Sequence, residues 1–163
     1  MVIGVGNPFR RDDGIGPAVA AAIEGQHLPG VRVVFSDGEP SGLIEAWSGA
    51  GLAVIVDALH GSPAGRAPCP GRIHRVTPAG LDAQPSGAGA GSSAGSSHGL
   101  GLPDAFRLGR ALGREPRRAV IIAVEAADVR PGPDLSAAVA AAVPEAVAAV
   151  AAELRAAGRG GGR

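Results

Sequence analysis

Short, mostly apolar runs recur along this chain, and their alternation with helix-patterned stretches constrains its fold more than any other feature. Between the runs, apolar residues repeat at the spacing of one helical face. Strands that alternate with helices predict an α/β domain built on a mostly parallel sheet. The expected strands are residues 2–6, 31–36, 52–59 and 119–126, with 72–77 as a weaker edge strand.

The expected helices follow from the same spacing of apolar residues. In the third of them, Leu102, Phe106 and Leu112 carry the helical pattern. Pro144 lies within the last and must kink it or start a new segment, because proline has no backbone N–H. The expected helices are residues 14–25, 41–49, 102–113 and 135–158.

The length of 163 residues fits a single α/β domain, which we expect to span residues 1–158. Residues 78–97 are rich in Gly, Ser and Ala and hold almost no large apolar side chain. Such a segment buries too little surface to offset the entropy of ordering, so we predict a mobile loop. Residues 159–163 are expected to form a frayed tail.

Composition excludes several classes of function. The formal net charge is zero and there is no lysine, so nothing favours a nucleic acid or an anionic membrane as partner. The few aromatic residues offer no base-stacking surface. A single cysteine forms no internal disulfide and no cysteine-rich zinc site. With no leader-like start and no apolar run of ~20 residues, the chain is expected to be soluble and cytoplasmic.

Residues 4–16, "GVGNPFRRDDGIG", hold the first candidate site. They follow a strand and precede a helix, as a dinucleotide-binding loop does. However, Phe9 replaces the third glycine, and Asp12 and Asp13 would lie beside a pyrophosphate. A plain strand-to-helix turn accounts for one carboxylate near a helix N-terminus, but poorly for an acid pair in a long, glycine-framed loop.

Sites in open α/β sheets form at the carboxyl ends of strands, where two acids are expected here. Asp13 follows the first strand, and Asp57 lies near the end of the most apolar one. With His98 in residues 96–102, they form a two-oxygen, one-nitrogen set that suits a first-row divalent metal. The alternative is structural, because aspartate commonly accepts hydrogen bonds from local backbone. Residue types alone leave both interpretations open.

Other patterns point to no chemistry. Residues 91–95, "GSSAG", match the nucleophile elbow of α/β hydrolases, but that elbow needs a strand before it and a helix after it. Cys69 has no neighbouring histidine and no Cys-x-x-Cys partner, so we interpret it as a bystander thiol. His60 and His74 match no motif and are expected to be dispensable for the site.

Taken together, the motifs resemble those of the nickel-iron hydrogenase maturation proteases. The likeness rests on "GVGNPFRRDDGIG", "VIVDAL" and "SSHGLGL" and spans nearly the whole chain. It implies a three-layer sandwich in which helices cover a five-stranded, mostly parallel twisted sheet with one antiparallel edge strand. It also implies an endopeptidase that removes the C-terminal extension of a hydrogenase large-subunit precursor after nickel insertion.

By this resemblance, the catalytic, nickel-sensing and metal-binding positions are Asp13, Asp57 and His98. The expected cofactor is nickel, carried by the precursor, which is the expected partner; other divalent metals are expected to bind in vitro. The chain itself is expected to be a monomer. Two mechanisms are compatible with this set. The metal can act as a Lewis acid while a carboxylate such as Asp12 takes the proton, or the side chains can recognise the precursor's ion.

One departure from the family lies after the second strand. The family usually reads Asp-Gly-Gly-Thr there, whereas Glu39 and Pro40 replace the last two residues, so substrate contacts are expected to differ. Two rivals remain. A peptidyl-tRNA hydrolase has a similar opening turn, but it needs a histidine soon after the turn and a basic surface. A nickel-dependent maturation chaperone that does not cleave is the other.

Overall fold

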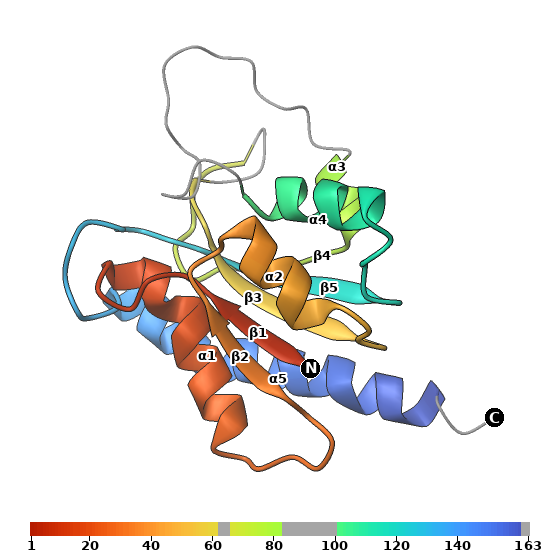
Figure 1. The fold of residues 1–163 in the computed structure, drawn as a ribbon. Helices are drawn as coiled ribbons and strands as arrows, with labels where there is room; N and C mark the ends of the chain where they lie inside the picture. The colour runs from red at the N-terminus through yellow and green to blue at the C-terminus, as the bar shows by residue number, and fades with distance from the viewer. Residues whose placement is uncertain (62–65, 83–100, 161–163) are drawn as a thin grey trace.

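The computed structural model describes residues 1–61, 66–82 and 101–160. Its five strands form one sheet in the order β2-β1-β3-β5-β4 (Figure 1). All neighbouring pairs are parallel except β4 and β5, which are antiparallel at one edge. The predicted α/β class and the antiparallel edge strand are confirmed. The strands are β1 (Val2–Val5), β2 (Val33–Ser36), β3 (Ala53–Leu59), β4 (Ile73–Val76) and β5 (Ala119–Glu125).

Helices cover both faces, which makes the sheet the middle of three layers (Figure 1). Helices α1 and α5 pack on one face, and α2 and α4 pack on the other. A single 3₁₀ turn, η1, joins β1 to α1. The helical elements are η1 (Arg11–Gly14), α1 (Ile15–Glu24), α2 (Pro40–Trp47), α3 (Pro78–Asp82), α4 (Leu102–Ala111) and α5 (Ala137–Gly160).

The central strands are apolar throughout because they are buried on both faces. In β3, Val54 belongs to the cluster under α1 and α5, whereas Ile55 belongs to the cluster under α2 and α4. The parallel register places Val54 beside Val2 of β1 and Val120 of β5. One layer of the core is therefore continuous across three strands.

Two glycines of the opening motif allow close backbone contact where β1 meets α1. A Cβ on Gly16 would lie 2.1 Å from the carbonyl oxygen of Val5 and 2.6 Å from that of Val56. Gly6 has a φ of +128°, and a Cβ there would lie 1.9 Å from the carbonyl oxygen of Asp13. Residues with a side chain cannot fit at these positions without moving the backbone, so the glycines fix how η1 sits on the sheet.

The last helix, α5, continues through Pro144 instead of ending there. Pro144 and Ala140 are both exposed, so water can reach the Ala140 carbonyl that loses its helical hydrogen bond. By length and composition, α5 is the one described helix that could cross a membrane. Its buried residues Val139 and Val150 instead pack in the core with α1 and the sheet.

Three predicted segment boundaries differ from those in the structure. Helix α4 ends at Ala111, two residues before the predicted end, and Leu112, its C-cap, is 56% exposed, unlike the buried Leu102 and Phe106. Helix α3 occupies residues 78–82, where we expected the loop to begin, and residues 83–97 lie outside the described residues. Helix α5 extends to Gly160, and residues 161–163 also lie outside.

Candidate active site

The two predicted acids meet at the carboxyl ends of β1 and β3. These strands are neighbours, and the chain leaves β1 toward β2 on one side and reaches β3 on the other. Such a point of diverging connections is where open α/β sheets place their ligands. Turn η1 follows β1 and carries Asp12 and Asp13 in its first turn, while Asp57 lies near the end of β3.

Asp12 is a structural acid. It is fully buried, and its carboxylate accepts hydrogen bonds from the amides of Ala127 (2.8 Å) and Asp128 (2.9 Å). Ser136 donates to it from both its amide (2.6 Å) and its hydroxyl (2.9 Å). Both carboxylate oxygens are therefore occupied by the connection between β5 and α5. The expectation that Asp12 acts as a base does not fit this environment.

Asp13 has the opposite character, because one of its oxygens remains largely free. The amide of Asn7 donates to Oδ2 at 2.9 Å, whereas Oδ1 lies 3.7 Å from Nε2 of His60. Burial acts to raise the pKa of Asp13, but His60 and the Asn7 amide outweigh it and hold the pKa below the ordinary value. Asp13, only 6% exposed, is an ionised carboxylate at neutral pH.

Asp57 is partly buried beside this charge. Burial raises the pKa of Asp57 to about 7; the negative charge of Asp13 adds to the shift, and the amide of Ala58 opposes it. That amide donates to Oδ1 at 2.9 Å. Two neighbouring carboxyl groups thus have pKa values displaced in opposite directions, an arrangement typical of sites where one acid binds or stabilises charge and the other exchanges a proton.

The third predicted ligand, His98, lies outside the described residues. No three His, Cys, Asp or Glu side chains in the described ranges form a group that could hold a metal ion. The structure does bring His60 to Asp13, which the sequence interpretation missed. Its position directly after β3, three residues from Asp57, is the one signal that could have suggested it.

A second acid at the same edge serves the fold. Glu125 ends β5, is 1% exposed, and accepts a hydrogen bond from the amide of Cys69 at 2.6 Å. Nε2 of His74 lies 2.7 Å from its Oε1. The Cys69 amide and His74 together hold the pKa of Glu125 below its ordinary value. These contacts tie the segment before β4 to the end of β5.

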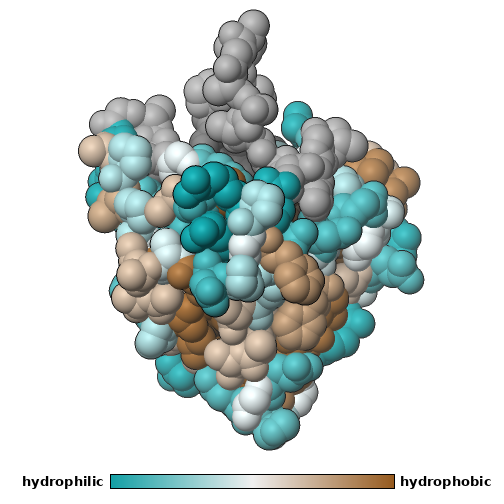
Figure 2. Space-filling model, turned by 90° about the vertical axis from the view of Figure 1, so that its left-hand side faces the viewer, coloured by the Kyte–Doolittle hydropathy of each residue, from teal (hydrophilic) through white to brown (hydrophobic). Residues whose placement is uncertain are grey.

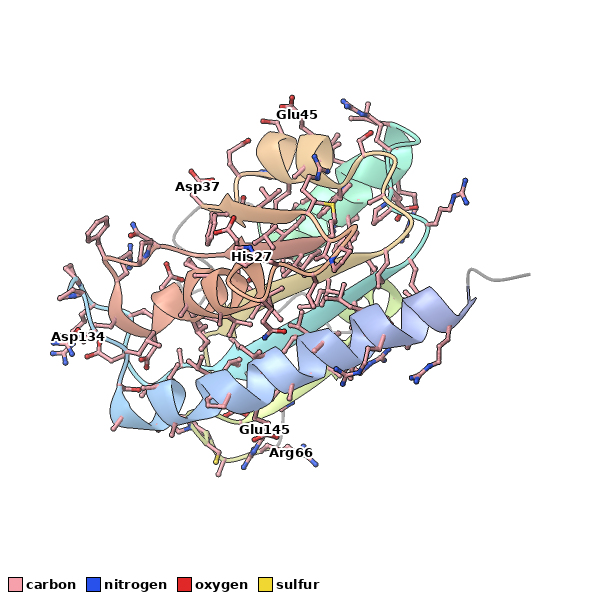
Figure 3. All side chains as sticks on the ribbon, turned by 90° about the horizontal axis from the view of Figure 1, so that it is seen from below. His27, Asp37, Glu45, Arg66, Asp134 and Glu145 are labelled. Carbon is pink, nitrogen blue, oxygen red and sulfur yellow. The ribbon has the colours of Figure 1, made fainter. Side chains whose placement is uncertain are left out.

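The departure at Glu39 and Pro40 has a local structural reason. Glu39 is the N-cap of α2, and its carboxylate accepts from the amide of Gly42 at 3.0 Å and from the hydroxyl of Ser41. Pro40 occupies the first turn, where a missing N–H costs nothing. These two residues start α2 and leave Asp37, which is exposed, at the carboxyl edge of the sheet (Figure 3).

The surface at this edge is mixed in character. Figure 2 faces the side of the molecule where the strands end and shows hydrophobic atoms beside hydrophilic ones. Phe9, in the loop after β1, is 74% exposed, and Phe35, near the end of β2, is 49% exposed. Exposed phenylalanines near a site can contribute apolar contacts to a polypeptide partner.

Comparisons with known proteins show that this chain is similar in fold to peptidases. No family model matches the sequence, and no curated protein matches it. Among solved structures, the hydrogenase maturating endopeptidase HybD from E. coli matches with a TM-score of 0.74 and 27% identity, over 96% of this chain and 92% of that one. An endopeptidase from Escherichia coli gives 0.71 and 25%, over 96% and 93%.

A NiFe hydrogenase maturation protease HybD from Thermococcus kodakarensis shares the fold, with a TM-score of 0.70 and 24% identity over 94% of this chain and 96% of that one. These likenesses cover nearly the whole of each chain. The resemblance to hydrogenase maturation proteases that the sequence indicated, and the fold that it implied, are confirmed.

Proposed function

We propose that this chain, a peptidase similar in structure to the hydrogenase maturation endopeptidases, removes the C-terminal extension of a nickel-iron hydrogenase large-subunit precursor after nickel insertion. The nickel belongs to the precursor and is part of the substrate. Asp13, Asp57 and His98 are the proposed sensing and catalytic residues. We also propose that the chain acts as a monomer in the cytoplasm.

The observation that carries this proposal is the pairing of Asp13 with Asp57 at the switch point of the sheet. An ionised carboxylate with one free oxygen is a suitable ligand for a divalent cation such as Ni²⁺. In Asp13 that oxygen is Oδ1, because the Asn7 amide occupies Oδ2. The donor chemistry therefore fits a nickel-bearing substrate, with His98 proposed as a nitrogen ligand.

Asp57 is suited to the proton transfers of peptide hydrolysis. Its pKa of about 7 leaves comparable amounts of acid and carboxylate at neutral pH. A carboxylate in this state can take a proton from an attacking water molecule, and the resulting acid can give it to the departing amine. We therefore assign proton transfer to Asp57 and cation recognition to Asp13, whereas Asp12, whose two oxygens are occupied, takes no part in the proton transfer.

The test is to incubate the protein with nickel-loaded and nickel-free precursor and to measure product mass. Cleavage of the nickel-loaded form alone, at one position near its C-terminus, is the expected result. Asp13→Asn and Asp57→Asn should each abolish it. Asp134→Asn, which removes an exposed carboxylate from the β5–α5 connection (Figure 3), is the matched control and should cleave normally.

Stable complex formation without a shorter product would support the non-cleaving chaperone instead. Equal cleavage of both precursor forms would contradict nickel recognition while leaving the peptidase activity intact.

A further inference from the structure

We propose that His60 is a further substrate-binding residue of this site, whose imidazole Nε2 joins Asp13 Oδ1 in binding the divalent cation carried by the precursor. The inference rests on the proposed function and names a residue that no motif marks. Its basis is the position of His60 at the end of β3, together with its contact to Asp13.

The separation of the two atoms suits donors to a common ion. Nitrogen and oxygen ligands bind metals such as zinc at about 2.1 Å. Two such donors lie about 3.0 Å apart when they meet the ion at a right angle, and about 3.4 Å apart at a tetrahedral angle. The observed distance is 3.7 Å, so a shift of a few tenths of an ångström brings both onto one ion.

The same distance is longer than a normal hydrogen bond, so the contact between the two atoms is loose enough to open around an ion. His74 provides the contrast, because its Nε2 lies 2.7 Å from a carboxylate oxygen of Glu125. Within the described part of the chain, Asp13 is the only hydrogen-bonding or ion-pair partner of the His60 side chain. His60 therefore keeps a nitrogen available at the oxygen of Asp13 that Asn7 leaves free.

The environment also limits how far His60 can move. Its side chain is 18% exposed and that of Asp13 is 9% exposed. Two ligands held this way lose little conformational freedom on binding. A pair of donors does not complete a coordination shell, and the described residues hold no group of three that could bind an ion. With His98 as the proposed further nitrogen ligand of this chain, the precursor that carries the ion supplies the other donors.

The first test measures binding of Zn²⁺ and Ni²⁺ to the free protein, without any precursor. In protein with ¹⁵N-labelled histidine, Zn²⁺ should shift the ring-nitrogen resonances of His60, and Asp13→Asn should suppress that shift. Calorimetry should show His60→Ala weakening the affinity by about ten-fold or more. His27→Asn is the control: His27 is exposed at the end of α1, and asparagine tolerates its φ of +48°.

The second test measures cleavage of nickel-loaded precursor by the same variants. His60→Ala should raise KM more than it lowers kcat, and circular dichroism and thermal unfolding should match the wild type. Unshifted His60 resonances, or an unchanged affinity in His60→Ala, would overturn the inference. If the wild type binds Zn²⁺ through His60 but leaves the precursor intact, the proposed function fails while the ligand assignment stands.

Discussion

Replacing Asp57 with asparagine should stabilise the folded protein at neutral and alkaline pH. The pKa of this carboxyl group is raised from 3.8 to about 7, first by burial and then by the charge of Asp13. Between these two values the folded state binds more protons than the unfolded state. The free energy of unfolding therefore falls as pH rises through this window. Asparagine keeps the shape of the side chain and carries no charge at any pH.

The magnitude follows from the size of the shift. Each pKa unit corresponds to about 1.4 kcal/mol, so ionising Asp57 in the folded protein costs about 4 kcal/mol in all. Part of this cost is already present at pH 5. Between pH 5 and pH 8, the stability advantage of Asp57→Asn over the wild type should grow by about 2–3 kcal/mol. For a chain of this length, that is about 4–12 °C in Tm.

The assay is urea or thermal unfolding of both proteins between pH 5 and pH 8, with a chelator present and the ionic strength held constant. Asp134→Asn, at an exposed position, controls for the loss of one negative charge. An advantage that stays constant across this range would refute the reasoning. An Asp57→Asn protein less stable than the wild type at pH 8 would also refute it.

Three other outcomes are expected. Asp12→Ala should lower the free energy of unfolding by about 2–3 kcal/mol in urea, because it removes a buried carboxylate that accepts four partly buried hydrogen bonds. Asp13→Asn should destabilise less and still stop cleavage; equal losses of stability would contradict these separate roles. Gly16→Ala should lower the free energy of unfolding by more than about 3 kcal/mol, because its Cβ would overlap two backbone carbonyls. Gly51→Ala, with open space around the added Cβ, is the control and should leave stability unchanged. A soluble Gly16→Ala protein with the wild-type Tm would be inconsistent with this packing. His98→Ala should change the free energy of unfolding by less than about 1 kcal/mol but sharply slow cleavage of the nickel-loaded precursor. If this variant cleaves the precursor at the wild-type rate, His98 does not belong to the proposed site.

The strands could be predicted from the sequence because a strand that is buried on both faces is apolar at nearly every position. A run such as residues 52–59 stays apolar at every position until Asp57, and only a strand covered on both sides requires that. The same reasoning located Asp13 and Asp57, because parallel strands present their carboxyl ends at one edge. The apolar run of a strand and the acid at its end are both patterns within a few consecutive residues.

The separate roles of the two adjacent acids could not be predicted in this way. Asp12 is defined by its bonds to Ala127, Asp128 and Ser136, which lie far along the sequence. The contact of His60 with Asp13 likewise depends on how η1 packs beside β3. No local pattern reports a long-range partner, so sequence analysis treated Asp12 as a possible base and His60 as dispensable.

Pro144 shows a different limit. Its effect on α5 depends on whether the carbonyl that it leaves unpaired can reach water, and the sequence gives no direct sign of exposure. In the structure that side of α5 is exposed and the helix continues.

The bonds from Asp12 to the segment after β5 also bear on when a newly made chain can become active. The amides of Ala127 and Ser136 that hold Asp12 are synthesised 115 and 124 residues after it. Until then Asp12 lacks the hydrogen-bond donors that compensate for burying its charge, so it cannot take up its buried position. The arrangement of η1 seen in the structure therefore cannot form before residues 127–136 have been synthesised, so a nascent chain shorter than this lacks the ordered site.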